Sequence, residues 1–200
     1  MINKMIDMFR NKKIALLGFG KEGQSTYRFL RNYFPDLVLT IIDKKDIRNH
    51  EILVSDRKIE FVVGDTYLDH LEQYDLVIKS PGISLKEVDT SKIHMTSQIE
   101  LLLSIAKDHV IGVTGTKGKT TTASLIYQIL LANHVDTVLA GNMGIPVFSI
   151  LDKINKDTMI VIEMSSHQLE YLSTSPHIGI VLNLFEDHLD HAGSVEHYHK

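Results

Sequence analysis

The residues with the clearest chemical potential form a short loop of glycine, lysine and threonine, G-T-K-G-K-T-T, from Gly115 to Thr121. A β-branched run precedes the loop and a helical pattern follows it. Its backbone N–H groups and the helix N-terminus would therefore point at one spot and favour an anion. Lys119 would meet the outer phosphates of a nucleotide, and a hydroxyl of Thr120 or Thr121 would ligate Mg²⁺. The match to the P-loop pattern G-x-x-x-x-G-K-[ST] is incomplete, because Val113 stands at its first position. We interpret the loop as a polyphosphate site, with a plain glycine turn before a lysine-capped helix as the alternative.

A second glycine turn, G-F-G-K-E-G, runs from Gly18 to Gly23 between a predicted strand and a predicted helix. This is the context of a dinucleotide fingerprint. Asp43 ends the next strand 20 residues after Gly23, where a ribose-binding carboxylate is expected. The pattern alone indicates a phosphate or a nucleotide, with NAD as one candidate, although close packing of a helix on a strand requires the same glycines. A further turn, K-S-P-G-I-S at residues 79–84, falls at the ligand-facing edge of such a sheet, with a plain strand-to-loop turn as the alternative.

Acidic residues and histidines follow two later strands. Glu163 stands at the carboxyl end of an apolar run, at the edge where the P-loop opens, and would reach a Mg²⁺ held by ATP. The next strand leads to Asn183, Glu186, Asp187, His188, Asp190 and His191. Histidines among acids suggest zinc, but a hard metal beside phosphates favours Mg²⁺ with oxygen ligands and one imidazole. We therefore assign a function to Glu163 and His188. The other side chains of this tail are interpreted as a solvated loop: Asp190, His191, His197 and His199.

The composition indicates a soluble globular protein with a real core. Of the 200 residues, 44% are apolar and 23% are charged, and the formal net charge is −4. No general attraction to nucleic acid or to anionic lipid is expected from that balance. The absence of cysteine excludes disulfides and thiolate metal sites. The first residues are too polar for a secretory signal and no apolar run approaches a membrane span, so we expect a cytoplasmic protein, and a monomer.

Short β-branched runs alternate with helical patterns, which predicts a parallel α/β architecture. Strands are predicted at residues 13–19, 37–43, 59–64, 74–82, 109–115, 136–141, 157–164 and 177–185, and helices at 23–34, 96–107 and 119–133. Ser97 is the expected cap of the second helix, with Glu100 three residues on. The strand–glycine–helix pattern restarts after that helix. We therefore place a boundary near Lys107, between a Rossmann-like parallel-sheet domain (1–107) and a partial P-loop ATPase domain (108–200).

Six motifs taken together resemble the Mur ligases of peptidoglycan synthesis. They are G-F-G-K-E-G, S-P-G-I, T-G-T-K-G-K-T-T-T, G-N-M-G-I-P, E-M-S-S-H-Q-L-E and N-L-F-E-D-H-L-D-H-A-G-S, in the family's order and spread over most of the chain. The stretch S-S-H-Q-L-E after the acid-ended strand resembles the D-glutamate-adding member of the family, more than its relatives or folylpolyglutamate synthase. One motif alone would be weak evidence, but the set is specific.

The resemblance implies an ATP-dependent ligase that phosphorylates the terminal carboxylate of UDP-N-acetylmuramoyl-L-alanine. The acyl phosphate is then attacked by the amine of D-glutamate. ATP would be bound by Gly115, Thr116, Lys117, Gly118, Lys119, Thr120 and Thr121. Mg²⁺ would be held by Thr120, Glu163 and His188, and the catalytic residues would be Lys119, Glu163 and His188. The UDP-substrate would contact Gly18, Phe19, Gly20, Lys21, Glu22, Gly23, Asp43, Lys44, Ser80, Pro81, Gly82 and Asn142. The resemblance thus favours the UDP end of the substrate over NAD at the front turn.

The chain departs from the family in two respects. Lys117 stands where relatives often carry asparagine, and the lysine that becomes carbamylated in the family would fall just beyond Lys200. The resemblance then implies that the rest of the central domain and the D-glutamate-binding C-terminal domain are missing, and that this chain alone is inactive. Three alternatives stay open. They are a stand-alone UDP-sugar-nucleotide binding module, an NAD-binding oxidoreductase domain fused to a P-loop unit, and a sister ligase that adds another amino acid.

Overall fold

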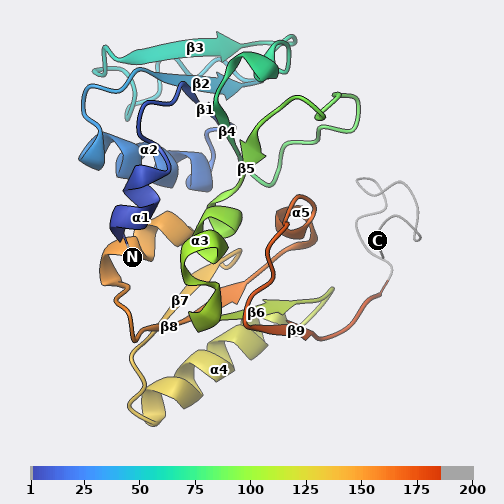
Figure 1. The fold of residues 1–200 in the computed structure, drawn as a ribbon. Helices are drawn as coiled ribbons and strands as arrows, with labels where there is room; N and C mark the ends of the chain where they lie inside the picture. Colours follow the sequence, from blue (N-terminus) through green and yellow to red (C-terminus); the bar gives the residue numbers. More distant parts are fainter. Residues whose placement is uncertain (1, 186–200) are drawn as a thin grey trace.

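The protein is described here by a computed structural model that covers residues 2–185. Two parallel sheets with helices on their faces make up this part of the chain (Figure 1), as the alternation of β-branched runs and helical patterns predicted. The first sheet has the strand order β3-β2-β1-β4-β5, and the second has the order β7-β8-β6-β9. Every neighbouring pair of strands in both sheets runs parallel.

The predicted strands are all present, with shorter bounds than the apolar runs suggested. The first sheet contains β1 (Ile14–Leu17), β2 (Leu39–Asp43), β3 (Ile59–Val63), β4 (Leu76–Lys79) and the unpredicted two-residue β5 (Met95–Thr96). The second contains β6 (Val110–Thr114), β7 (Thr137–Gly141), β8 (Met159–Glu163) and β9 (Ile178–Val181). Strands β1, β6 and β8 are buried along almost their whole length, which is why they read as continuous apolar runs.

The predicted helices correspond to α2 (Lys21–Tyr33), α3 (Gln98–Ala106) and α4 (Lys119–Ala132). The sequence did not indicate the short helices α1 (Ile2–Asp7) and α5 (Ser166–Leu169), nor the 3₁₀ segments η1 (Leu71–Gln73), η2 (Lys107–His109) and η3 (Val147–Lys153). Ser97 caps α3 as predicted, since its hydroxyl accepts from the Glu100 N–H at 3.2 Å. The Glu100 carboxylate, however, bonds to Ser173 and Thr174 beyond α5. No helix within residues 2–185 is long and apolar enough to cross a bilayer.

Strand order in the first sheet creates a crevice at the carboxyl ends of β1 and β4. The chain moves outward from β1 to β2 and β3, and then returns to place β4 on the other side of β1. The loops that leave β1 and β4 therefore diverge, and ligands of open α/β sheets bind at this kind of switch point. The turn at Gly18 and the turn at Ser80 lie at this crevice, as predicted from the two glycine-containing motifs.

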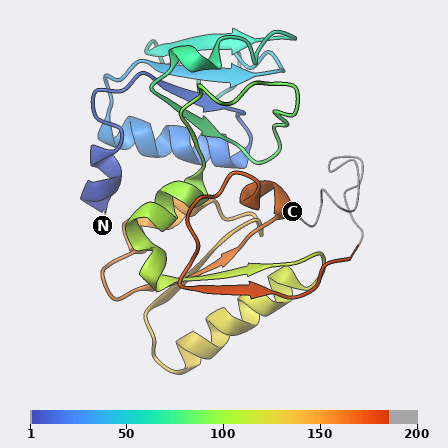
Figure 2. The same cartoon turned by 45° about the vertical axis from the view of Figure 1, so that its right-hand side comes forward.

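One continuous apolar core joins the two sheets. Helices α2 and α3 lie between the sheets, and α4 covers the far face of the second sheet (Figure 2). At the centre, the ring of Phe9 packs edge-on against Phe29 of α2 and Phe148 of η3, with centroids 6.1 and 6.4 Å apart. Met5 of α1 is fully buried in the same cluster. The two sheets are thus joined by a shared layer of packed apolar side chains.

An ion pair between Arg31 of α2 and Asp56 fastens the loop between β2 and β3. Both side chains are mostly buried, with 16% and 13% of their surface exposed. Burial acts to raise the pKa of Asp56, but hydrogen bonds from Arg31, the Lys58 N–H and the Tyr27 hydroxyl outweigh it. The pKa of this carboxyl therefore lies below its ordinary value of 3.8.

We expect the Asp56 contribution to stability to be lost in acid. Because the pKa is lower in the folded state, the stabilisation is fully present above pH 3.8 and declines as the pH falls through the folded-state pKa. Asp56→Asn should lower the free energy of unfolding at pH 7 by roughly 2 kcal/mol. The difference from wild type should shrink between pH 4 and pH 2. Urea titrations across that range measure it, with the exposed Asp36→Asn as control; a pH-independent difference would contradict the assignment.

Candidate functional site

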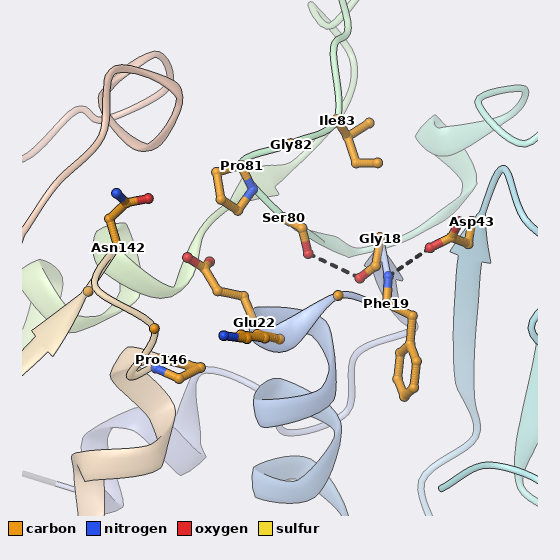
Figure 3. Close-up of a pocket in the computed structure, with 14 residues that line it drawn as sticks. Gly18, Phe19, Glu22, Asp43, Ser80, Pro81, Gly82, Ile83, Asn142 and Pro146 are labelled. Atoms are coloured by element: carbon orange, nitrogen blue, oxygen red, sulfur yellow. Dashed lines mark hydrogen bonds between the residues drawn. The ribbon is translucent and has the colours of Figure 1, made fainter. Parts of the chain in front are cut away.

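A cavity of about 370 Å³ opens at the switch point of the first sheet and is closed by the second sheet on its other side (Figure 3). The turn after β1, the start of α2, the end of β2 and the loop after β4 contribute Gly18, Phe19, Gly20, Lys21, Glu22, Asp43, Ser80, Pro81, Gly82 and Ile83 to its lining. The end of β7 and the loop after it contribute Gly141, Asn142, Gly144 and Pro146. All residues predicted for the UDP-substrate line it except Gly23 and Lys44. Gly23 packs beneath the turn against the backbone of Gly18.

Four further residues line the cavity without having been predicted as substrate contacts: Ile83, Gly141, Gly144 and Pro146. They lie within S-P-G-I and G-N-M-G-I-P, the two motifs that contain the predicted contacts Ser80 and Asn142, so the signal that could have found them is present in the sequence.

The front turn is held in shape by side chains from β2 and β4. Gly18 has φ +90°, a conformation that favours glycine. One carboxylate oxygen of Asp43 accepts from the Phe19 N–H at 2.9 Å, and the Ser80 hydroxyl donates to the Gly18 carbonyl at 3.0 Å. Figure 3 shows these two bonds converging on the turn from opposite sides. Asp43 and Ser80 therefore fix the backbone conformation of the turn, which determines the shape of the cavity.

The P-loop follows β6 and leads into α4. Gly115 and Gly118 have φ of +140° and +85°, and Gly118 is the N-cap of α4. The Lys119 ammonium folds back over the loop and donates to the carbonyls of Gly115 at 2.6 Å and Thr116 at 2.9 Å. Phosphate oxygens entering the loop would compete for this ammonium, as a polyphosphate site requires.

Asn183, two residues beyond β9, clamps the same loop. Its side chain accepts from the Lys117 N–H and donates to the Lys117 carbonyl, both at 2.9 Å, and its backbone carbonyl accepts from the Thr116 N–H at 3.0 Å. Lys117 is thus held by its backbone, while the residue itself is exposed. These contacts involve only the backbone of residue 117 and do not depend on its side chain.

Asn183→Ala should weaken nucleotide binding by about five- to tenfold, because the loop loses both side-chain bonds that pre-organise it. Titration with a fluorescent ATP analogue measures the effect, and Asn49→Ala, at an exposed position of the loop between β2 and β3, is the matched control. Equal affinities of Asn183→Ala and wild type would show that the loop keeps its shape without the clamp.

Glu163, at the end of β8, is the most constrained acid near the P-loop, with 2% of its surface exposed. One carboxylate oxygen accepts from the Thr120 hydroxyl at 2.7 Å, and the other accepts from the Asn142 side-chain amide at 2.9 Å. The Glu163 carbonyl also accepts from the Asn142 N–H at 2.9 Å. Gly141 permits this approach, since a Cβ there would lie 2.1 Å from the Glu163 carbonyl oxygen. Glu163 therefore connects the P-loop helix with the wall of the front cavity.

The donor set at this point fits Mg²⁺ bound together with a nucleotide. A carboxylate and a hydroxyl already lie at hydrogen-bond distance, and Mg²⁺ in proteins is commonly held by one or two carboxylates plus phosphates and water. Within residues 2–185 no cluster of three or more His, Cys, Asp or Glu side chains is present, so nothing described here resembles a preformed all-protein metal site. His188, predicted as a metal-binding and catalytic residue, lies outside the described residues, as do Glu186, Asp187, Asp190, His191, His197 and His199.

Two family models match this chain. The model of the Mur ligase MurD-like N-terminal domain matches residues 12–101, and the model of the Mur ligase middle domain matches residues 113–200. Between them they leave only the first eleven residues and residues 102–112 unmatched. The chain therefore belongs to the Mur ligase family and carries its N-terminal and middle domains.

Within this family, curated relatives include UDP-N-acetylmuramoylalanine–D-glutamate ligases of clostridia. The protein from Clostridium botulinum (strain Kyoto / Type A2) is 31% identical over 204 residues, and that from Clostridium acetobutylicum is 30% identical over 203 residues. Each alignment covers 98% of this chain and 44% of the relative, so the chain spans less than half the length of these proteins.

Solved structures of ligases resemble the fold more loosely. The UDP-N-acetylmuramate:L-alanyl-gamma-D-glutamyl-meso-diaminopimelate ligase from Neisseria meningitides gives a TM-score of 0.49 at 15% identity and covers 94% of this chain and 66% of its own. A pseudomurein peptide ligase type C from Methanothermus fervidus gives 0.38 at 23% identity, covering 94% and 41%.

Proposed function

We propose that this protein is a cytoplasmic ligase that adds D-glutamate to UDP-N-acetylmuramoyl-L-alanine and converts ATP to ADP and phosphate. The observation that carries the proposal is the placement of Glu163 between Thr120 of the P-loop helix and Asn142 of the front cavity. A nucleotide bound to the P-loop and a substrate bound in the front cavity would meet at this carboxylate. The clostridial relatives named for that reaction support the choice of substrate.

Each part of the described chain has a role in this proposal. We assign residues 1–107 to the UDP-substrate and residues 108–200 to ATP. The loop amides from Gly115 to Thr121 and the Lys119 ammonium would hold the phosphates. The ammonium would also stabilise the negative charge on the phosphoryl group during its transfer. Asn142 would orient the substrate carboxylate toward that group, since it lines the cavity and contacts Glu163.

Thr120 and Glu163 are the described residues that would hold Mg²⁺. The ion would neutralise charge on the phosphates and bring the attacking and leaving oxygens into line. In the overall reaction the substrate carboxylate takes the γ-phosphoryl group and ADP leaves. The D-glutamate amine then displaces phosphate from the acyl carbon and loses a proton, so that one amide bond forms.

Phosphate release by the complete gene product tests the proposal. The protein is supplied with ATP, Mg²⁺, UDP-N-acetylmuramoyl-L-alanine and a panel of amino acids, and released phosphate is measured. We expect release that requires both the UDP-substrate and D-glutamate. Release with a different amino acid would identify a sister ligase, and absence of release with intact UDP-substrate binding would identify a binding module; either result contradicts the proposal.

A further inference from the structure

An acidic side chain stands inside the turn that, on the proposed function, receives the diphosphate of the UDP-substrate. Glu22 is the second residue of α2 and lines the front cavity. Figure 3 shows its carboxylate pointing from the start of α2 toward Pro81. The N-terminus of a helix attracts anions, but a carboxylate at this position competes for the same field and repels a second anion. An unbalanced charge on Glu22 would therefore oppose the binding of a diphosphate.

Two buried glutamines fix Glu22 in place. Gln168 of α5 donates to one carboxylate oxygen at 2.6 Å, and Gln98 of α3 donates to the Glu22 backbone carbonyl at 2.9 Å. Burial raises the pKa of Glu22, while the Gln168 bond and the charge of Lys79 act to lower it. The carboxylate thus depends on Gln168 of α5 and on Lys79 of β4 for its charge to be tolerated at this depth.

Lys79, the last residue of β4, lies behind Glu22. Only 4% of its surface is exposed, a rare degree of burial for lysine. The ammonium has long contacts to the carbonyls of Ser80 and Pro81, at 3.3 and 3.5 Å, and lies 5.1 Å from the ring centroid of Tyr171. Glu22 and Lys79 line the same small chamber of about 20 Å³, and Tyr171 and Gln168 close it. That volume is sufficient for about one water molecule.

Two carboxylates interact electrostatically with the Lys79 ammonium. Burial lowers its pKa, and the two groups that act to raise it are the carboxylates of Glu170 and Glu22. Glu170 is exposed to solvent, so its field is screened, whereas Glu22 shares the buried chamber. Glu22 is therefore the carboxylate that most needs this ammonium.

We propose that Lys79 is a positioning residue that neutralises Glu22 from the side away from the ligand, so that the front turn accepts a diphosphate. The inference rests on the proposed function for the ligand, and on the shared chamber for the two side chains. Gln168 and Tyr171 belong to the segment between β8 and β9, so this segment of the chain contributes contacts to both Glu22 and Lys79. Removing Lys79 leaves the carboxylate uncompensated next to the phosphates, while removing the charge of Glu22 makes Lys79 dispensable for binding.

A double-mutant cycle tests this coupling in the complete gene product. Calorimetry measures the affinity for UDP-N-acetylmuramoyl-L-alanine in wild type, Lys79→Met, Glu22→Gln and the double variant. We expect Lys79→Met to weaken binding about tenfold in the wild-type background and less than about twofold in the Glu22→Gln background. Lys92→Met removes an exposed positive charge from the loop between β4 and β5 and should change affinity by less than about twofold.

Thermal unfolding of the same four proteins without ligand measures the interaction between Lys79 and Glu22 independently of the substrate. Lys79→Met should lower the melting temperature more in the wild-type background than in the Glu22→Gln background. Equal losses of affinity and of stability in both backgrounds would overturn the inference while leaving the proposed function intact. A wild-type protein that binds no UDP-muramoyl ligand would overturn the proposed function and, with it, the role of Lys79 in diphosphate binding.

Discussion

Replacing Glu163 with glutamine is expected to reduce Mg²⁺-dependent nucleotide binding by at least about 100-fold with little loss of stability. Glutamine has the size of glutamate, and its amide can still accept from Asn142 and donate to the Thr120 hydroxyl. The two contacts at 2.7 and 2.9 Å can therefore be kept in rearranged form. What disappears is the negative charge that a Mg²⁺ bound with ATP requires. Titration with a fluorescent ATP analogue, with and without Mg²⁺, measures the loss.

Glu170→Gln is the matched control for this substitution. It removes the same charge seven residues further on, from an exposed side chain that does not contact Thr120 or Asn142. Nucleotide affinity with Mg²⁺ should stay within about twofold of wild type. If Glu163→Gln binds MgATP as tightly as the control does, Glu163 is only a structural link between the two loops.

Gly23→Ala is expected to lower the free energy of unfolding by about 3 kcal/mol and to collapse the front cavity. A Cβ at this position would lie 2.1 Å from the Gly18 carbonyl oxygen, which is backbone and cannot move aside cheaply. Separating α2 from the turn would also break the bond from the Gln24 N–H to Gly20 and misplace Gly18. A melting temperature lower by roughly 6–12 °C is expected for a chain of this size.

Gly20→Ala serves as the control because a Cβ there meets nothing within 4 Å. It stands at the N-cap of α2, where alanine is a poorer cap than glycine, so a loss below about 1 kcal/mol is expected. Similar losses for both variants would mean that the turn tolerates a side chain at Gly23 by shifting the helix.

The parallel α/β fold could be predicted from the sequence because buried parallel strands produce unmistakable apolar runs. Residues 110–114 and 159–163 are examples, and each is followed by the polar residues that the strand delivers to the ligand edge. Short elements gave no such signal. Helix α5 has four residues and β5 has two, too few for either periodicity to be seen. Their existence depends on contacts with distant residues, such as Gln168 with Glu22.

The sequence predicted the single motifs of the candidate site, but not the contacts that bring these motifs together. The glycine turns and Glu163 were found because strand–glycine–helix junctions and acid-ended strands have a local signature. That Asn142 would bond to Glu163, or that Asn183 would clamp Lys117, requires the packing of separate segments, and no spacing in the sequence encodes it. Lys79 was quoted only as the first residue of K-S-P-G-I-S, and no role was predicted for it, for the same reason. A lysine at a strand end reads as solvated until its burial is known.

The apolar core around Phe9, Phe29 and Phe148 has a consequence for how ligands associate. Since this core fixes the two walls of the front cavity before any ligand arrives, a ligand that touches both Gly18 and Asn142 need not close a hinge between them. Its association should follow a single bimolecular phase, with a rate that rises in proportion to ligand concentration and does not level off at a conformational step. The heat-capacity change on binding should correspond to the surface of the cavity and the ligand alone.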